Sequence, residues 1–324
     1  MNLVGKRILI TGGTGMIGSC LVNVLIKETD NSVVLIVRDE KKARLRLGSS
    51  CNSNKVEFVV GELGCGDVPK IDGRVDAIIH LASNTHPIAY VEHPISTIMM
   101  NVGATKGLLD IAAKNHDCRF LYASSVEVYG QNRGDAELFD ETYCGYIDCN
   151  TLRAGYPESK RCGESLCQAY IREKNIDCVI ARLARVYGPT LLKTDTKALS
   201  QFLWKALAGE DIVLKSKGEQ YFSYIHCEDA VRAILMILEK GTCGEAYNVA
   251  DEKSDIQLKD LAELVAGYSG TKVVFDLPTE KEAAGFSKAT VARLDSAKLK
   301  SLGWTPMYDI KSGVFETINF IRKG

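Results

Sequence analysis

The sequence has no strong charge of either sign and no long hydrophobic run. Its 324 residues carry 40 lysines and arginines against 41 aspartates and glutamates, a formal net charge of −1. This balance argues against nucleic-acid binding and against electrostatic attachment to anionic membranes. No apolar stretch approaches the length of a membrane span, and a strand predicted from Arg7 leaves no room for a signal peptide. We therefore expect a cytoplasmic protein that binds neither nucleic acid nor membrane.

The sequence also lacks the spacing of a metal site or of a disulfide framework. The eleven cysteines are an odd number without a Cys-x-x-Cys, and the five histidines form no cluster. Cys144 and Cys149, like Cys162 and Cys167, have no further ligands at zinc spacing. We expect reduced thiols and no bound metal. Internal repeats and low-complexity tracts are absent too.

Apolar runs and amphipathic patterns alternate along the chain with short connections. Strands are predicted at residues 7–11, 33–37, 56–60, 75–80, 119–125, 177–183, 212–215 and 245–249, and one more strand ends near residue 226. Helices are predicted from the first glycine-rich turn to about residue 29 and at 94–115, 156–173, 197–207, 228–240, 258–268 and 310–322. The strands at 56–60 and 75–80 are almost continuously apolar, as burial on both faces requires. This alternation predicts a doubly wound parallel α/β sheet of the Rossmann type.

The pattern of predicted strands and helices changes after Tyr187-Gly188-Pro189, which suggests a second, smaller domain. We predict a dinucleotide-binding Rossmann domain over residues 1–187, to which residues 228–250 return. Residues 188–227 and 251–324 then form a smaller C-terminal α/β lobe that binds substrate. The irregular segment 131–153 is expected to cover the site.

A glycine-rich turn follows the first predicted strand. Gly12-Gly13-Thr14-Gly15-Met16-Ile17-Gly18 lies between that strand and a helix, the context in which such a turn binds phosphate. Gly12 permits the tight turn, Gly15 lets the backbone approach a pyrophosphate, and Gly18 lets the helix pack closely. The helix N-terminus then faces the phosphate charge. The predicted contacts of a dinucleotide here are Gly12, Gly15, Met16, Ile17 and Gly18.

The end of the second predicted strand bears on the choice between NAD and NADP. NAD-binding sites usually place a carboxylate there for the ribose hydroxyls. In this chain Val37 aligns with that position and Arg38 follows. A guanidinium suits a 2′-phosphate, so Arg38 favours NADP, although an arginine stacked on adenine is the alternative. The adenine and ribose side is expected to be lined by Glu62, Leu81, Ala82 and Ser83.

Tyr156 and Lys160 stand four residues apart at the start of an amphipathic helix, which places phenol and ammonium on one face. A phenol has a pKa near ~10 and is a poor base at neutral pH. A fixed ammonium beside it favours the phenolate. The spacing alone is weak support for catalysis. The support is stronger because a predicted phosphate site lies upstream. In addition, Ser125 places a hydroxyl at a predicted strand end between the phosphate site and Tyr156.

Together these motifs resemble those of the extended short-chain dehydrogenases/reductases that modify nucleotide sugars, the epimerase, dehydratase and decarboxylase family. The resemblance covers almost the whole chain, and UDP-glucuronate decarboxylases are its nearest subfamily. The matching stretches are Thr11-Gly12-Gly13-Thr14-Gly15-Met16-Ile17-Gly18, His80-Leu81-Ala82-Ser83, Ser125-Val126-Glu127-Val128-Tyr129-Gly130, Arg153 with Tyr156 and Lys160, and Tyr187-Gly188-Pro189.

The resemblance implies a role for each matching residue. Ser125 would hydrogen-bond the sugar, and Tyr156 would take a hydroxyl proton beside the nicotinamide. Lys160 would bind the nicotinamide ribose and hold Tyr156 ionised, and Glu127 would be an acidic group near the sugar. The alternative for Ser125 is a strand-end cap without a catalytic role, and the alternative for Glu127 is a solvated surface acid. Relatives of this kind pair two subunits through the helices at 94–115 and 156–173, so a homodimer is implied.

Two departures from the family pattern concern the substrate side. The relatives usually carry Arg-x-x-Asn before Tyr-Gly-Pro, whereas this chain ends that motif with Arg185. They also have an arginine in a Gln-x-Arg stretch where this chain has Phe222, and phenyl cannot pair with phosphate. We expect Arg185 to supply the missing charge, with help from Lys197. The predicted substrate contacts are therefore Arg153, Arg185, Lys197 and Phe222.

The prediction is an NAD(P)-dependent enzyme that modifies a nucleotide-activated sugar through a transient 4-keto intermediate. Decarboxylation and epimerisation rank equally, and dehydration ranks below them. One alternative is a net reductase that consumes NADPH on a keto-sugar or another carbonyl. Another is a dinucleotide-sensing protein without catalysis, which would need none of Ser125, Tyr156 and Lys160 together.

Overall fold

A computed structural model describes residues 2–64, 67–84, 92–277 and 291–323 of the chain. Its centre is a seven-stranded sheet in which neighbouring strands run parallel. Across the sheet the strands are β10 (Ala246–Val249), β6 (Asp177–Leu183), β5 (Arg119–Ser125), β4 (Ala77–His80), β1 (Arg7–Thr11), β2 (Ser32–Val37) and β3 (Val56–Val60). The predicted doubly wound Rossmann sheet is confirmed.

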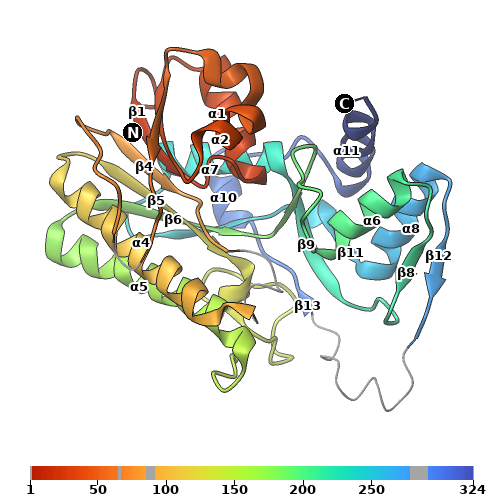
Figure 1. The fold of residues 1–324 in the computed structure, drawn as a ribbon. Helices are drawn as coiled ribbons and strands as arrows, with labels where there is room; N and C mark the ends of the chain where they lie inside the picture. Colours follow the sequence, from red (N-terminus) through yellow and green to blue (C-terminus); the bar gives the residue numbers. More distant parts are fainter. Residues whose placement is uncertain (1, 65–66, 85–91, 278–290, 324) are drawn as a thin grey trace.

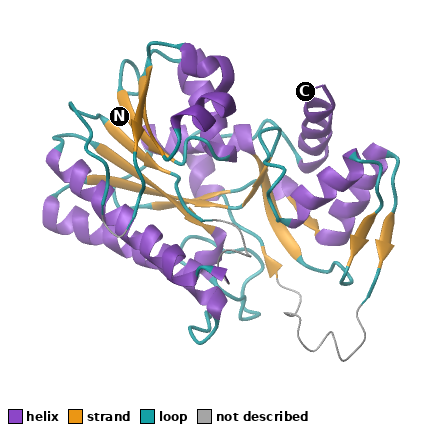
Figure 2. Cartoon of the chain, viewed as in Figure 1, coloured by secondary structure: helices purple, strands orange, loops and turns teal. Residues whose placement is uncertain are grey.

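Helices cover both faces of this sheet (Figures 1 and 2). One face packs against α1 (Met16–Glu28), α2 (Glu40–Leu47) and α7 (Cys227–Lys240), and the other against α4 (Pro94–Lys114) and α5 (Gly155–Lys174). Successive residues of a strand point to opposite faces. In β1, Ile8 and Ile10 accordingly join the core under α1, while Leu9 joins the core under α4 and α5.

The second lobe has a hydrophobic core of its own, which includes Leu203, Val265 and Val314. Around it lie α6 (Ala198–Leu207), α8 (Leu258–Ser269), α11 (Ile310–Lys323) and the paired strands β8 (Ile212–Leu214) and β12 (Val273–Phe275). Strand β9 (Tyr221–His226) pairs with β7 (Arg185–Tyr187), β11 (Asp255–Gln257) and β13 (Val291–Ala292). The short helix α10 (Ala297–Ser301) packs against β10.

Most predicted elements lie where their patterns placed them. The strands at 7–11, 56–60, 119–125 and 177–183 have the predicted ends, while the strand predicted from 75 begins at Ala77. Residues 246–249 do join the main sheet beside β6. The exact domain boundaries at 187 and 227 stay predictions, and part of the predicted lobe (278–290 and 324) lies outside the described residues.

Strand β3 differs from the expectation of burial on both faces. It is the edge strand, and Val60 is 58% exposed. Helix α2 was not predicted, because its sequence EKKARLRL has only Ala43 and Leu47 buried and offers no long apolar stripe. The side chain of Asp39 begins this helix by accepting a hydrogen bond from the backbone N–H of Lys42.

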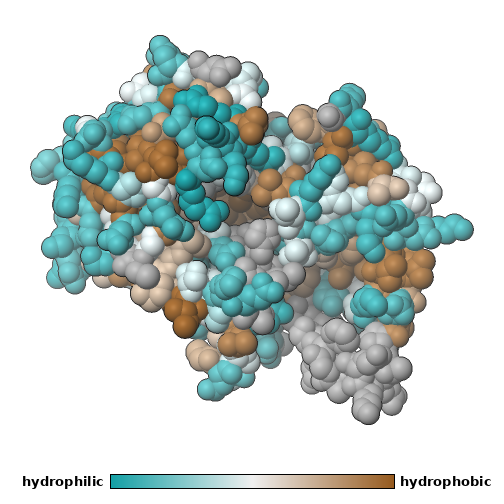
Figure 3. Space-filling model, in the orientation of Figure 1, coloured by the Kyte–Doolittle hydropathy of each residue, from teal (hydrophilic) through white to brown (hydrophobic). Residues whose placement is uncertain are grey.

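The surface in the view of Figure 3 is mostly hydrophilic, with small scattered hydrophobic areas, and it is hollowed between the sheet and the second lobe. None of the described helices combines the length and the apolar character needed to cross a membrane.

Candidate active site

The hollow between the two lobes is a cavity of about 1570 Å³ at the carboxyl ends of the sheet strands. In open α/β sheets this edge is where ligands bind. The residues that the sequence predicts to act in catalysis, cofactor binding or substrate binding all line it: Gly12, Gly15, Met16, Ile17, Gly18, Arg38, Glu62, Leu81, Ala82, Ser83, Ser125, Glu127, Arg153, Tyr156, Lys160, Arg185, Lys197 and Phe222. The structure therefore brings all of these residues to one cavity, and their individual roles stay predictions.

The glycine-rich turn has the shape that a dinucleotide phosphate requires. Gly12 has φ of +72°, and a Cβ there would lie 2.8 Å from the backbone nitrogen of Ala82. A Cβ on Gly18 would collide with the carbonyl of Gly12. Gly15 precedes α1 without a side-chain cap, so the first backbone N–H groups of the helix are available to a phosphate. The turn therefore fits a dinucleotide.

The segment after β4 is tied to the glycine-rich turn through Thr11. The Thr11 hydroxyl lies 2.7 Å from Nδ1 of His80, and it accepts a hydrogen bond of 3.2 Å from the backbone N–H of Ala82. His80 is buried, and burial lowers its pKa to about 3. This positioning role of Thr11 and His80 was not predicted. Their places at the ends of two adjacent strands were the available signal.

At the end of β2 no carboxylate takes the place usual in an NAD site. Val37 is buried, Arg38 is exposed along the cavity, and the Asp39 carboxylate caps α2 instead. This part of the cavity therefore presents a guanidinium from the strand end, and its carboxylates come from Glu62 and Asp67, beyond the neighbouring strand.

Tyr156 and Lys160 lie on the first turns of α5, and both are buried. The Lys160 ammonium donates a hydrogen bond of 2.8 Å to the backbone carbonyl of Ala123 and lies 4.9 Å from the centre of the Tyr122 ring. Burial lowers the pKa of Lys160 to about 7, and the nearby carboxylate of Glu164 opposes this shift. The lysine can therefore change its protonation state near neutral pH.

Ser125 ends β5 at the cavity, opposite the start of α5. Its hydroxyl accepts a hydrogen bond of 3.3 Å from the backbone N–H of Glu127, so it caps the short 3₁₀ turn Val126–Tyr129. The turn places the Glu127 side chain along the cavity. The Ser125 hydroxyl can therefore cap this turn as an acceptor and still donate a hydrogen bond to a substrate, as predicted.

A buried asparagine connects the cofactor side of the cavity to α5. Asn101 of α4 accepts a hydrogen bond of 2.8 Å from the Ser83 hydroxyl and donates one of 2.8 Å to the Ser159 hydroxyl. Ser159 in turn donates to the backbone carbonyl of Tyr156. Asn101 was not predicted. Polar residues at helical spacing, with Thr97 and Thr105 one turn to either side of Asn101, were the signal that could have revealed it.

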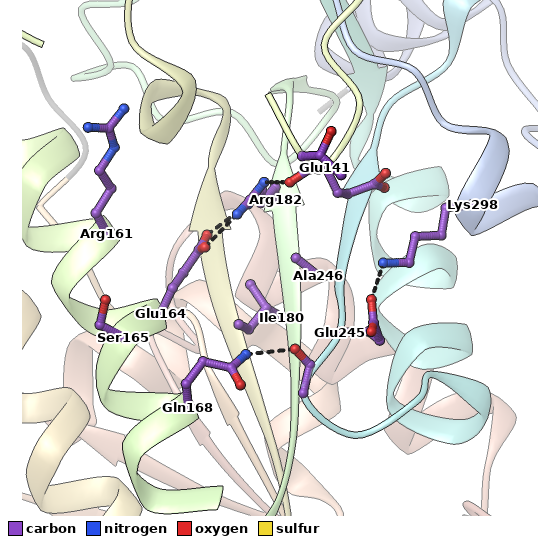
Figure 4. Close-up of a pocket in the computed structure, with 12 residues that line it drawn as sticks. Glu141, Arg161, Glu164, Ser165, Gln168, Ile180, Arg182, Glu245, Ala246 and Lys298 are labelled. Atoms are coloured by element: carbon purple, nitrogen blue, oxygen red, sulfur yellow. Dashed lines mark hydrogen bonds and ion pairs between the residues drawn. The ribbon is translucent and has the colours of Figure 1, made fainter. Parts of the chain in front are cut away.

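The two arginines of Arg182-Leu183-Ala184-Arg185 face different places. Arg182 donates two hydrogen bonds to the Glu164 carboxylate, of 3.0 and 2.7 Å, in a separate cavity of about 490 Å³ between α5, β6 and β10 (Figure 4). Arg185 faces the large cavity, where its Nη2 lies 3.7 Å from Oε1 of Glu127. Of these two arginines, Arg185 is therefore the one that lines the large cavity.

The remaining predicted substrate contacts lie along the second lobe and the covering segment. Lys197 is half-buried and directly precedes α6, and Arg153 is exposed just before α5. Phe222 of β9 is nearly buried beneath Arg185. Residues of the irregular segment 131–153, Gln131 and Tyr146 among them, also line the cavity, as predicted.

The model of the NAD dependent epimerase/dehydratase family matches residues 8–250 of the chain. This chain belongs to that family. UDP-glucuronic acid decarboxylase 1 of Xenopus tropicalis is 31% identical to it over 327 residues, which cover 98% of this chain and 72% of the relative. UDP-glucuronic acid decarboxylase 6 of Arabidopsis thaliana is 29% identical over 95% of this chain and 86% of the relative. The predicted resemblance to this subfamily is confirmed.

Solved structures of the family have the same fold. A UDP-glucose 4-epimerase of Thermotoga maritima superposes with a TM-score of 0.83 at 23% identity, covering 98% of this chain and 99% of the other. A dTDP-glucose 4,6-dehydratase of Streptomyces venezuelae, crystallised with NAD, gives 0.81 at 23% identity over 98% and 97% of the two chains. The fold class is thus confirmed, and so is the expectation of an enzyme of this epimerase/dehydratase type.

Proposed function

We propose that this family member modifies a nucleotide-activated sugar through a transient 4-keto intermediate. The observation that carries the proposal is the convergence of Ser125, Tyr156 and Lys160 on one cavity with the glycine-rich turn. A nicotinamide dinucleotide bound there would accept a hydride from the sugar and return it later. The residues of the chain then position the sugar and move its protons.

Tyr156 is proposed as the base that takes the proton of the sugar hydroxyl while that carbon is oxidised. Ser125 would hydrogen-bond the same oxygen as it becomes a carbonyl. A charged Lys160 favours the ionised form of Tyr156 by charge proximity. Because Lys160 has a pKa of about 7, this assistance weakens when the lysine loses its proton.

The result depends on the group beside the new ketone. A ketone at C4 acidifies the neighbouring C–H bond, which permits epimerisation or elimination of water. If C5 carries a carboxylate, the intermediate is a β-keto acid and loses carbon dioxide readily. We propose decarboxylation or epimerisation ahead of dehydration, and the curated relatives named as decarboxylases support the first.

Incubation with UDP-, GDP-, CDP- and dTDP-sugars, followed by mass spectrometry, tests this proposal. A product lighter by about 44 mass units indicates decarboxylation, one lighter by about 18 indicates dehydration, and an isomer indicates epimerisation. Tyr156→Phe should abolish turnover while nucleotide-sugar binding persists. Full turnover by Tyr156→Phe would contradict the proposal. So would the absence of any product from all of the nucleotide sugars tested.

The choice of NADP over NAD is proposed from Arg38. The exposed guanidinium lies along the cavity where a carboxylate would select NAD, and Asp39 is engaged as a helix cap. Arg38→Ala should weaken NADPH binding about tenfold or more and leave NADH binding within about twofold. The reverse preference in the unchanged protein, measured by fluorescence titration, would overturn this choice.

A net reductase acting on a keto-sugar is the second candidate, and Arg38 is the observation that favours it. Such an enzyme consumes NADPH, whereas an internally recycling enzyme shows no net change of the nicotinamide. Absorbance of reduced nicotinamide during turnover separates the two: a steady decrease supports the reductase.

We also propose a homodimer that forms through α4 and α5, in the cytoplasm. The two helices pack side by side on one face of the sheet (Figure 1). Cys162 and Ala169 of α5 are exposed. None of the ten described cysteines forms a disulfide, and four of them are exposed, which suits a reducing compartment. Light scattering should show a dimer that Ala169→Arg converts to a monomer, and a monomeric unchanged protein would contradict it.

A further inference from the structure

Arg185 carries a positive charge into the cavity, and the protein itself only partly satisfies it. Its Nη1 is buried and has no hydrogen-bond partner among the described residues. Its Nη2 lies 3.7 Å from the Glu127 carboxylate, which is near enough for attraction but too far for a hydrogen bond. Buried donors in native proteins are nearly always paired. The side chain is 26% exposed, so a small turn of the guanidinium would present this unpaired donor to a ligand in the cavity.

The neighbouring strand holds this guanidinium in a fixed plane. Strands β7 and β9 run parallel, with Arg185 opposite Tyr224 and Phe222 two residues before Tyr224 on the same face. The central carbon of the guanidinium lies 3.5 Å from the centre of the Phe222 ring. A stacked guanidinium keeps its edge free for in-plane hydrogen bonds, and a planar fork of this kind matches carboxylate and phosphate oxygens.

The place of the guanidinium limits which part of a substrate it can reach. Glu127 follows Ser125 by two residues at the end of β5, on the side of the cavity where Ser125 and Tyr156 lie. The phosphate-binding turn belongs to another strand, β1. Arg185 therefore lies near the sugar end of the cavity, where a carboxylate of the sugar or the phosphate next to the sugar would stand.

We propose that Arg185 determines substrate specificity by binding an anionic group at the sugar end of the nucleotide sugar, an inference that rests on the proposed function. Without substrate the guanidinium is attracted to Glu127. An incoming anion accepts hydrogen bonds from the guanidinium edge and takes over this attraction, which leaves Glu127 free to face the sugar. Binding of the substrate anion by Arg185 and release of Glu127 from Arg185 are thus the same event.

Binding of UDP, UDP-glucose and UDP-glucuronate to the unchanged protein and to Arg185→Gln tests the proposal. The measurement is calorimetry at low ionic strength, where charge contributes most. A loss of about 10- to 100-fold for UDP-glucuronate alone identifies a sugar carboxylate as the anion. An equal loss for all three identifies a phosphate, which also supports the proposal. Affinities within about twofold for all three overturn it.

Matched variants separate charge recognition from a structural effect. Arg322→Gln makes the same charge change on an exposed residue at the end of α11 and should leave all three affinities unchanged. Arg185→Lys keeps the charge but loses the fork, so it should fall between Arg185→Gln and the unchanged protein. In the double variant Arg185→Asn/Phe222→Arg the guanidinium would enter from the neighbouring strand, and affinity should exceed that of Arg185→Asn and approach that of the unchanged protein.

A double variant no better than Arg185→Asn would overturn the proposed position of the anion. Turnover and binding by the unchanged protein test the proposed function, whereas the Arg185 variants test the specificity proposal. If it turns over a nucleotide sugar and Arg185→Gln binds that sugar equally well, the proposed function stands and the specificity proposal fails. If it binds none of the three probes and turns over no sugar of the panel, both fail.

Discussion

A single lysine shows how function and stability conflict in this protein. Lys160 is buried against the sheet, where its ammonium has one hydrogen bond among the described residues, to the carbonyl of Ala123, and a nearby aromatic ring. Removing an ammonium from water disfavours its charged form, which is the cause of the pKa of about 7. The same ammonium is what the proposed chemistry needs beside Tyr156. Burial of Lys160 therefore lowers the stability of the folded protein, and the proposed role beside Tyr156 explains why a lysine is present there.

Lys160→Met should abolish turnover and raise the stability of the cofactor-free protein. Folding lowers the lysine pKa from 10.5 to about 7, so below pH 7 the folded chain must protonate a buried amine and its cost is fully present. The cost fades as pH rises towards 10.5. Urea unfolding at pH 6.5 should show a gain of about 1–4 kcal/mol, and at pH 9.5 a clearly smaller one. An equal gain at both pH values would contradict this account.

His80 should make the folded protein sensitive to acid. Its pKa is about 3 in the folded chain and 6.5 when exposed, so the unfolded chain gains a proton first. Stability from this residue is present above pH 6.5 and is lost as pH falls towards 3. His80→Gln keeps an acceptor for the Thr11 hydroxyl and does not titrate. Between pH 7.5 and 4.5 it should lose about 2 kcal/mol less unfolding free energy than the unchanged protein.

Among the elements, α5 matters most because it carries Tyr156 and Lys160. Its seat on the sheet depends on Gly163, where an added Cβ would collide with the Tyr122 hydroxyl and lie 3.0 Å from Cε1 of that ring. Tyr122 is fully buried in β5 and cannot move aside without disturbing the core. The absent side chain therefore fixes how closely the catalytic helix approaches the strand that bears Ser125.

Gly163→Ala should lower both stability and turnover. Overpacking at such a contact costs about 1–3 kcal/mol and moves the helix outwards. Gly267→Ala in α8 is the control, since a Cβ there meets nothing within 4 Å and alanine favours a helix. Thermal unfolding and steady-state rates should show the first variant impaired and the second equal to or more stable than the unchanged protein. Full activity of Gly163→Ala would show that α5 tolerates displacement.

At the scale of the whole molecule, one hydroxyl links the second lobe to the dinucleotide-binding turn. Thr190, just after Tyr187-Gly188-Pro189, donates a hydrogen bond of 2.9 Å to the carbonyl of Met16, and its own carbonyl accepts one from Arg46 of α2. The start of the second lobe thus contacts the first turn of α1. Binding of a dinucleotide at that turn and closure of the lobe over it are expected to be coupled.

Thr190→Val removes this link with little change of volume. We expect dinucleotide affinity to fall about 3- to 10-fold, which is the value of one lost hydrogen bond. Thr242→Val, on an exposed turn before β10, is the matched control and should not change affinity. Fluorescence titration with NADH and NADPH measures both. Equal affinities of Thr190→Val and the unchanged protein would show that the contact is not coupled to binding.

Some of this protein follows from its sequence alone. The glycine-rich turn, the Tyr156–Lys160 pair and the buried strands were predictable because each depends on neighbours within a few residues, where backbone geometry fixes which side chains share a face. The family pattern added Ser125 and Glu127, and the structure places all of them around one cavity.

Only the tertiary structure decided the partnerships between distant strands and helices. Arg182 and Arg185 stand three residues apart, yet one pairs with Glu164 of α5 and the other stacks on Phe222 of β9. Asn101 joins Ser83 to α5 across the packed helices. The strands of the second lobe that were not predicted, β7, β11, β12 and β13, have only two or three residues each, too few for a period to show. Each of these contacts depends on which surfaces meet when the chain packs, and no local pattern contains that information.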